Sequence, residues 1–147
     1  MARRRPKPRD PYRSMYEDNI ASWMEANGIK FTYETYSYQY EAPVRKNRSK
    51  CGECGSKNLV FDGWYTPDFF VGSHLIVEAK GRFTAADRRK IKAARDSVPE
   101  LKEKLVMMFM TDNKLNRSAK QRYSDWCKQE GIDYTIGTEL KEDWING

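Results

Sequence analysis

Apolar residues recur along the chain at two spacings, one typical of α-helices and the other of β-strands. Helical spacing predicts three helices, at residues 14–28, 84–97 and 118–130. Alternating or continuous apolar runs predict strands at residues 29–40, 65–71, 75–79, 104–110 and 132–136. This order of elements is typical of an α/β fold, in which a mixed β-sheet carries helices on its faces.

Two of the predicted strands are close enough in sequence to form a β-hairpin. The runs Tyr65–Val71 and Leu75–Ala79 flank a short connector that contains a glycine, the usual residue where a turn needs a positive φ. A three-residue loop places Asp68 directly opposite Glu78, whereas a two-residue loop makes the pair diagonal. Lys80 follows Glu78 by two residues and therefore points to the same face of the strand. Either register brings two carboxylates and one ammonium group together.

Two carboxylates on one small patch of sheet repel each other unless one takes up a proton or a cation lies between them. Oxygen ligands suit Mg²⁺ or Mn²⁺, so Asp68 and Glu78 are candidate metal ligands. Lys80 could orient or deprotonate an attacking water, or stabilise charge on a phosphorus atom. Alternatively, Asp68 is a turn residue and the two strand residues are exposed charges that discourage edge pairing. The flanking apolar strands, with Pro67 and Gly81, favour a nuclease site.

Basic residues are concentrated at the N-terminus of the chain. The 147 residues carry a formal net charge of +6, and the pI is about 9.2. Most of the excess lies in residues 1–13, where prolines disfavour a helix, so we expect a disordered basic tail that binds DNA phosphates. A tail that serves solubility or localisation is the alternative. The candidate DNA-binding residues of this tail are Arg3, Arg4, Arg5, Lys7, Arg9 and Arg13.

The predicted helix at 84–97 carries a second basic surface on one arc. Because this helix follows Lys80 closely, its basic arc is a candidate phosphate-binding face beside the site, and a solvated face is the alternative. The residues of this arc are Arg88, Arg89, Lys92 and Arg95.

The first predicted helix begins at Ser14, which has the spacing of a capping box with Glu17. Glu17 lies at the edge of the apolar stripe of this helix, so it either faces a site across the border of the core or only caps its own helix. The alternation in residues 29–40 changes phase near Thr35, which predicts a break in the strand. Glu34, at this break, is a further candidate acid.

The chain has three cysteines, an odd number that argues against a disulfide framework and favours a reducing compartment. Cys51 and Cys54 have the spacing of half a zinc site, and zinc needs four ligands. Three possibilities remain: no metal, a site completed by His74 or Cys127, or a four-cysteine site shared between two chains. No apolar run approaches the roughly 20 residues that span a membrane, and no signal peptide is evident, so we expect a cytoplasmic protein.

Five short blocks of this sequence occur in the order found in the phage endonuclease I family. They are Ser14-x-x-Glu17-Asp18, Gly28-Ile29-Lys30-Phe31, Tyr65-Thr66-Pro67-Asp68-Phe69, Val77-Glu78-Ala79-Lys80-Gly81 and Cys127-x-x-Glu130-Gly131-Ile132. Over residues 14–145 the chain therefore resembles these Holliday-junction resolvases of the restriction-endonuclease-like, PD-(D/E)XK superfamily. The resemblance implies a restriction-endonuclease-like mixed β-sheet flanked by helices, in a domain-swapped homodimer.

The chemistry that this resemblance implies is Mg²⁺- or Mn²⁺-dependent hydrolysis of phosphodiesters in branched DNA, such as a four-way junction. Carried over by motif, Asp68 and Glu78 resemble the metal ligands of the family. Lys80 resembles its catalytic lysine, and Glu17 the acid that the swapped helix contributes. The two sites of such a dimer would cut opposed strands across the junction.

The domain organisation expected from the resemblance is a basic tail at 1–13 followed by a nuclease domain at 14–147. Within that domain we expect the swapped helix and strands at 14–40, a bridge with the cysteine-pair insertion at 41–63, and the catalytic core at 64–147.

One departure from the family pattern concerns an additional glutamate, where this chain has Thr32 and Glu34 is a possible substitute. Two other functions remain open at this point. One is a nuclease of the same fold that acts on transposon ends, restriction sites or mismatches, and the other is a non-catalytic binder of branched nucleic acid. The family points to a phage or prophage origin.

Overall fold

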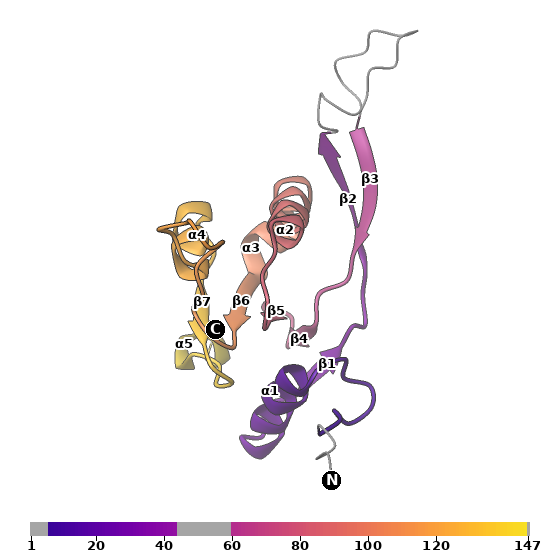
Figure 1. The fold of residues 1–147 in the computed structure, drawn as a ribbon. Helices are drawn as coiled ribbons and strands as arrows, with labels where there is room; N and C mark the ends of the chain where they lie inside the picture. The colour runs from indigo at the N-terminus through magenta and orange to yellow at the C-terminus, as the bar shows by residue number, and fades with distance from the viewer. Residues whose placement is uncertain (1–5, 44–59, 147) are drawn as a thin grey trace, which may run out of the picture.

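The computed structural model describes residues 6–43 and 60–146 (Figure 1). The helices are α1 (Met15–Ala26), α2 (Ala85–Ser97), α3 (Pro99–Lys104), α4 (Tyr123–Glu130) and α5 (Glu142–Ile145). The strands are β1 (Phe31–Tyr33), β2 (Tyr38–Pro43), β3 (Val60–Tyr65), β4 (Phe69–Val71), β5 (Leu75–Lys80), β6 (Leu105–Phe109) and β7 (Tyr134–Ile136).

A mixed five-stranded sheet in the order β1-β4-β5-β6-β7 forms the centre of the protein. The β1–β4 and β4–β5 pairs are antiparallel, whereas β5–β6 and β6–β7 are parallel. Helix α2 and the short α3 connect β5 to β6, and α4 connects β6 to β7. The predicted α/β class with a mixed sheet is therefore confirmed.

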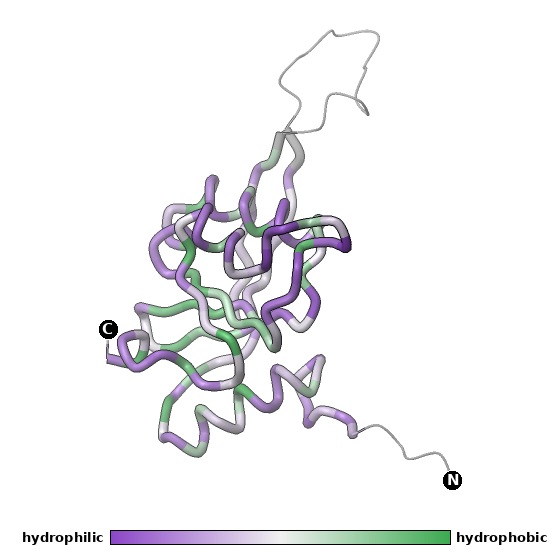
Figure 2. Tube along the Cα trace, turned by 60° about the vertical axis from the view of Figure 1, so that its left-hand side comes forward, coloured by the Kyte–Doolittle hydropathy of each residue, from purple (hydrophilic) through white to green (hydrophobic). Residues whose placement is uncertain are grey.

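Alternate residues of the central strands supply two separate hydrophobic clusters, one on each face of the sheet. On one face, Val77 and Met108 pack with apolar residues of α1 and α5. On the other face, Ile76 and Met107 pack with α2, α3 and α4. Figure 2 shows the hydrophobic stretches running through the middle of the molecule. Helices thus cover both faces, as a buried parallel pair of strands requires.

Strands β2 and β3 form a separate two-stranded antiparallel sheet that extends past α2 (Figure 1). We call this two-stranded sheet of β2 and β3 the arm. Its residues Tyr38 and Tyr40 are buried in the hydrophobic cluster on the α2 side of the main sheet. The break predicted near Thr35 is present between β1 and β2. Strand β2 continues to Pro43, three residues past the end of the strand predicted at 29–40. The bridge tip and the cysteine pair, Cys51 and Cys54, lie outside the described residues.

Local sequence signals account for most helix boundaries. Ser14 Oγ accepts a hydrogen bond from the backbone N–H of Glu17 at the start of α1. Thr84 and Asp87 form a full capping box at the start of α2. Gly131 ends α4 with a φ of 71°, a left-handed conformation that favours glycine. Helix α3 was not predicted, although Pro99 occupies its first turn.

No helix in the described part of the chain is both long enough and apolar enough to cross a lipid bilayer.

Candidate active site

The hairpin of β4 and β5 sets the geometry of the site. Val71 pairs with Leu75, so the loop has three residues, and Phe69 pairs with Val77. Of the two loop lengths considered for the hairpin, the three-residue loop is therefore the one that forms. The same register, continued by one residue, places Asp68 directly opposite Glu78. The predicted run Tyr65–Val71 is divided, because Tyr65 ends β3 in the other sheet and β4 begins only at Phe69.

Asp68 and Glu78 are both buried, with 7% and 5% of their surfaces exposed. Asp68 Oδ2 accepts a hydrogen bond from the Ala79 backbone N–H at 2.8 Å. Glu78 Oε2 accepts one from the Tyr65 hydroxyl at 2.7 Å. Burial raises the pKa of Asp68 well above its ordinary value, and the neighbouring charges of Glu78 and Glu17 raise it further. Burial likewise raises the pKa of Glu78.

Lys80 lies on the same face of β5 as Glu78, as its spacing predicted. Its Nζ is 3.4 Å from Glu78 Oε1 and 3.6 Å from Asp87 Oδ1. Burial alone would lower the pKa of Lys80, but the negative charges of Glu78, Asp87 and Asp68 outweigh burial and raise it. The side chain is therefore held as a cation. The contact with Asp87, which also caps the start of α2, was not predicted.

Glu17 reaches the same site from α1. Its Oε2 accepts a hydrogen bond from the Tyr33 hydroxyl and another, at 3.3 Å, from the Arg13 backbone N–H. Only the Ser14 half of the predicted capping box forms, since the Glu17 carboxylate is bound to these two groups. Glu17 therefore does more than cap its own helix, because it also lines the cavity that holds Asp68 and Glu78.

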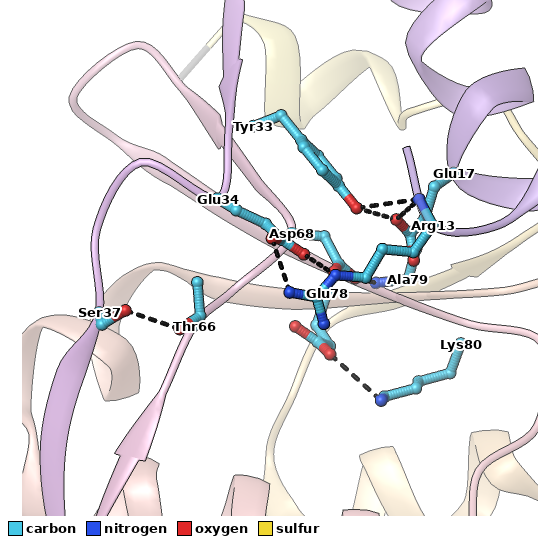
Figure 3. Close-up of polar contacts among 10 residues, drawn as sticks. All are labelled: Arg13, Glu17, Tyr33, Glu34, Ser37, Thr66, Asp68, Glu78, Ala79 and Lys80. Carbon is cyan, nitrogen blue, oxygen red and sulfur yellow. Dashed lines mark hydrogen bonds and ion pairs between the residues drawn. The ribbon is translucent and has the colours of Figure 1, made fainter. Parts of the chain in front are cut away.

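One cavity of about 330 Å³ joins these side chains. Its lining includes five acidic and three basic residues. They are Glu17, Glu34, Asp68, Glu78 and Asp87, with Arg13, Lys80 and Lys90. Trp64 and Tyr65 of the arm form another part of the wall. The cavity thus combines acids from α1, from the hairpin and from α2. Figure 3 shows those of α1 and of the hairpin, Glu17, Asp68 and Glu78.

The chemistry of the donor set fits a hard divalent cation. Within residues 6–43 and 60–146, no three His, Cys, Asp or Glu side chains lie close enough together to form a complete metal site. Asp68 and Glu78 nevertheless give two carboxylates in a buried place where Lys80 is the paired cation. Mg²⁺ is commonly bound by one or two carboxylates, with water and substrate phosphate filling its other positions.

Arg13 and Glu34 form an ion pair at the edge of the cavity. Arg13 Nε is 3.0 Å from Glu34 Oε1, and Arg13 Nη2 donates to Glu34 Oε2 at 3.0 Å. Glu34 has a φ of 50°, and its backbone N–H donates to the carbonyl oxygen of Asp68 at 2.9 Å. Arg13 thus belongs to the site itself, which its place in the basic tail did not predict.

The other basic residues of the tail that the structure describes lie away from the cavity lining. Arg9 binds the carboxylate of Asp18 on α1 through its backbone N–H and its Nε, at 2.9 and 2.7 Å. Lys7 is exposed. Arg3, Arg4 and Arg5 lie outside the described residues.

The basic arc of α2 divides into exposed and buried members. Arg89 is exposed, and Lys92 pairs with Glu130. Arg88 Nη1 donates to the Phe83 carbonyl oxygen at 2.8 Å. Arg95 points inward, because it is only 8% exposed and its guanidinium donates to backbone carbonyl oxygens. We therefore leave Arg95 out of the candidate DNA-binding surface.

The two residues considered as partners of the cysteine pair are both engaged elsewhere. Cys127 is buried in the core on the α4 side of the sheet, and burial raises the pKa of its thiol to about 12. His74 Nε2 lies 2.8 Å from the Trp144 carbonyl oxygen. A buried thiol that resists ionisation is a poor zinc ligand, so Cys127 does not fit as the residue that completes a zinc site at the cysteine pair.

Tyr33 and Tyr65 were not predicted to be part of the site. Each donates its hydroxyl to one of the acids, Tyr33 to Glu17 and Tyr65 to Glu78. The only signal in the sequence was that Tyr65 lies three residues before Asp68.

Sequence comparisons identify known relatives of this chain. The family described as "Phage endonuclease I" matches residues 58–146. The chain is 31% identical to "Endodeoxyribonuclease 1" of Enterobacteria phage T3 over 121 aligned residues. The alignment covers 82% of this chain and 68% of that protein. It is 29% identical to "Endonuclease I" of Escherichia phage T7 over 134 aligned residues. This alignment covers 91% of this chain and 78% of that protein. This protein belongs to the phage endonuclease I family.

Proposed function

We propose that this protein is an endodeoxyribonuclease that hydrolyses phosphodiesters in branched DNA, four-way junctions included, with Mg²⁺ or Mn²⁺ as its cofactor. The observation that carries the proposal is the buried pair of Asp68 and Glu78 with Lys80 on the same face of the hairpin. The names of the T3 and T7 relatives, both endonucleases, support the same chemistry.

In this proposal Asp68 and Glu78 hold the divalent cation. The bound cation would polarise the scissile phosphate and lower the pKa of a water molecule. Lys80 stays protonated beside Glu78 and Asp87, so it acts by stabilising negative charge on the phosphate and not as a general base. Glu17, which lines the same cavity, accepts a hydrogen bond from the attacking water and orients it.

We assign DNA binding outside the cavity to basic residues of the N-terminal tail and of α2. These are the tail residues Arg3, Arg4, Arg5, Lys7 and Arg9, with Arg88, Arg89 and Lys92 of α2. They contact phosphates, which fixes the position of the DNA without reading its sequence.

A homodimer that exchanges residues 14–40 between its subunits is a further part of the proposal. Helix α1 and strand β1 contact the hairpin through side chains and through the β1–β4 ladder, and residues 34–37 connect them to the arm. The same contacts can form between two chains if residues 34–37 direct α1 and β1 of one chain onto the hairpin of its partner. Each active site would then combine Glu17 of one chain with Asp68 and Glu78 of the other.

The first experiment measures cleavage of a four-way junction, a linear duplex and a single strand, each with Mg²⁺, with Mn²⁺ and with EDTA. We expect cutting of the junction with either metal and none with EDTA. Glu78→Gln should slow cleavage by about a hundredfold or more while junction binding is retained. Asp96→Asn, on the exposed side of α2, is the matched control. A Glu78→Gln protein that cuts normally would show that the site lies elsewhere, and equal cutting of linear duplex would contradict selectivity for branches.

A second experiment tests the exchange of segments by mixing two inactive variants, Glu17→Gln and Glu78→Gln, through co-expression. In a swapped heterodimer one site collects both substitutions and the other has none, so nicking of one strand should return. If each chain uses its own Glu17, every site carries one substitution and the mixture stays inactive. Persistent inactivity of a proven heterodimer would therefore contradict the swap.

A further inference from the structure

Arg13 is an exposed cation that lies against an acidic cavity. Its side chain is 74% exposed, whereas that of its partner Glu34 is only 19% exposed. Both residues line the cavity that holds Asp68, Glu78 and Lys80. In Figure 3 the Arg13 side chain extends from the start of α1 across the site to Glu34. The exposed member of the pair is thus the one that an incoming ligand meets.

The backbone of Arg13 is fixed, although its side chain is exposed. The backbone N–H of Arg13 donates to Glu17 Oε2 at 3.3 Å and contacts the Tyr33 hydroxyl at 3.4 Å. On its N-terminal side, the ring of Tyr12 packs edge-on against that of Tyr33, with centroids 4.9 Å apart. Four residues earlier, Arg9 is bound to Asp18. A guanidinium on such an anchored backbone can move between two nearby partners without moving the tail.

Glu34 is held in an unusual conformation that aims it at Arg13. Within the described residues it is the one non-glycine residue with a positive φ, and such a conformation costs free energy that the surroundings must offset. The offset is visible in the hydrogen bond from its backbone N–H to the Asp68 carbonyl oxygen. Strained residues of this kind cluster at functional sites. Glu34 is therefore coupled to Asp68 through the backbone and to Arg13 through the side chain.

We propose that Arg13 is a phosphate-binding residue of the active site, and that Glu34 holds its guanidinium over the cavity until a DNA phosphate takes the place of the carboxylate. This inference rests on the proposed nuclease function. Two parallel N–H donors match a phosphate as well as a carboxylate, because both present two oxygens in one plane. An exposed ion pair contributes little free energy, so exchanging one anion for another is easy.

The excess of acidic side chains in the cavity means that an entering phosphate needs a further cation, and Arg13 supplies one. Among the described residues that line the cavity, a phosphate that enters meets five carboxylates and, besides Arg13, only two cations, Lys80 and Lys90. Lys80 is already engaged by Glu78 and Asp87. Arg13 adds a cation from the N-terminal side. After the exchange the phosphate neutralises the arginine in place of Glu34.

The test compares the cleavage rate of bound junction with the affinity for it. Single-turnover cleavage is measured at saturating enzyme, and the Kd is measured in Ca²⁺ buffer. We expect Arg13→Gln to slow cleavage by about tenfold or more and to weaken the Kd by about threefold or less, because one bidentate contact is lost at the reacting phosphate. Arg13→Lys, which keeps the charge without the planar fork, should fall between wild type and Arg13→Gln. Arg117→Gln, an exposed arginine outside the cavity, is the matched control and should change neither quantity.

A double variant tests the part played by Glu34. If Glu34 acts through Arg13, then Arg13→Gln/Glu34→Gln should cleave no more slowly than Arg13→Gln alone. A double variant that loses the product of the two single effects would overturn the assigned role of Glu34.

The outcomes separate this inference from the function on which it rests. If the wild type cuts the junction and Arg13→Gln, folded by circular dichroism, cuts it at the wild-type rate, the role of Arg13 is overturned and the nuclease stands. If Arg13→Gln changes only the Kd, Arg13 is an ordinary contact of the tail, which also overturns the inference. If the wild type cuts no DNA with either metal, the proposed function itself fails.

Discussion

Replacing Asp68 by asparagine should make the metal-free protein more stable while removing its activity. Asparagine has the shape of the protonated acid, and its Oδ1 can still accept the hydrogen bond from the Ala79 N–H that Asp68 Oδ2 accepts at 2.8 Å. The change therefore removes a charge and leaves the packing and this backbone contact in place. The site is arranged for a cation, so the gain in stability should appear only when no cation is present.

The size of the effect follows from burial and from the neighbouring charges. Asp68 is 7% exposed, and its carboxylate is disfavoured by burial and by the charges of Glu78 and Glu17. Single stabilising substitutions commonly contribute about 0.5–2 kcal/mol, and we expect the relief of this buried charge to lie in the same range. For a chain of this length, 2 kcal/mol corresponds to a rise in Tm of about 4–8 °C.

The pH dependence of the same effect has a definite sign. Because folding raises the pKa of Asp68 above its ordinary 3.8, the stability contributed by this group is complete below pH 3.8 and is lost as the pH rises toward the folded pKa. The metal-free wild type should therefore lose stability between mildly acidic and neutral pH. Asp68→Asn, which does not titrate, should lose less over the same range.

The assay is thermal unfolding of both proteins at several pH values, in EDTA and in Mn²⁺. Mn²⁺ at ten times its Kd should stabilise the wild type by about 1.4 kcal/mol and Asp68→Asn by much less. Asp96→Asn, an exposed carboxylate on α2, should not change the Tm. An Asp68→Asn protein that is less stable than the wild type in EDTA at neutral pH, or that gains as much from Mn²⁺, would refute the reasoning.

Two other substitutions test how single contacts contribute. Tyr65→Phe removes the hydroxyl that Glu78 accepts at 2.7 Å, so a Mn²⁺ titration should show weaker binding and cleavage should slow by about 10- to 100-fold; an unchanged titration would show that the hydroxyl does not position Glu78. Arg95→Gln removes donors to two backbone carbonyl oxygens and should lower the free energy of unfolding in urea by about 1–3 kcal/mol with no change in junction Kd. Weaker DNA binding at unchanged stability would return Arg95 to the DNA-binding surface.

The parts of the site that the sequence predicted are those built from local signals. Alternation along two neighbouring strands and a glycine-containing loop were enough to place Asp68 opposite Glu78 and Lys80 beside Glu78. The helix predicted at 84–97 likewise begins where Thr84 and Asp87 form its capping box. Each of these features involves residues that are close in sequence, where the geometry of a strand or a helix leaves few alternatives.

The contacts that the sequence did not predict depend on how distant segments meet. Tyr65 donates to Glu78 from the end of β3, which pairs with β2 in the separate two-stranded sheet. The helix predicted from residue 118 begins only at Tyr123, because the Asn116 side chain binds the Ser118 N–H in a turn and a bridge between Lys114 and Arg122 keeps the chain extended. Helix propensity carries no information about such competing contacts.

An aromatic cluster explains how the N-terminal segment can carry part of the active site as one unit. The rings of Tyr12 and Phe69 both pack against that of Tyr33, with centroids 4.9 and 5.4 Å away. Each of these three aromatic residues is the direct neighbour in sequence of a polar residue of the site. The three polar neighbours are Arg13, Glu34 and Asp68.

The packed rings fix the backbone of the three aromatic residues, and the backbone of the polar residue next to each ring is fixed with it. Arg13 and Glu34, together with Glu17, therefore dock against Asp68 whenever Tyr12 and Tyr33 dock against Phe69. An exchange of the N-terminal segment between two chains would carry all three side chains to the partner's hairpin without rebuilding any contact among them. In such an exchange the site would be complete only after the N-terminal segment of one chain has docked on the hairpin of the other. Nuclease activity would then depend on that docking.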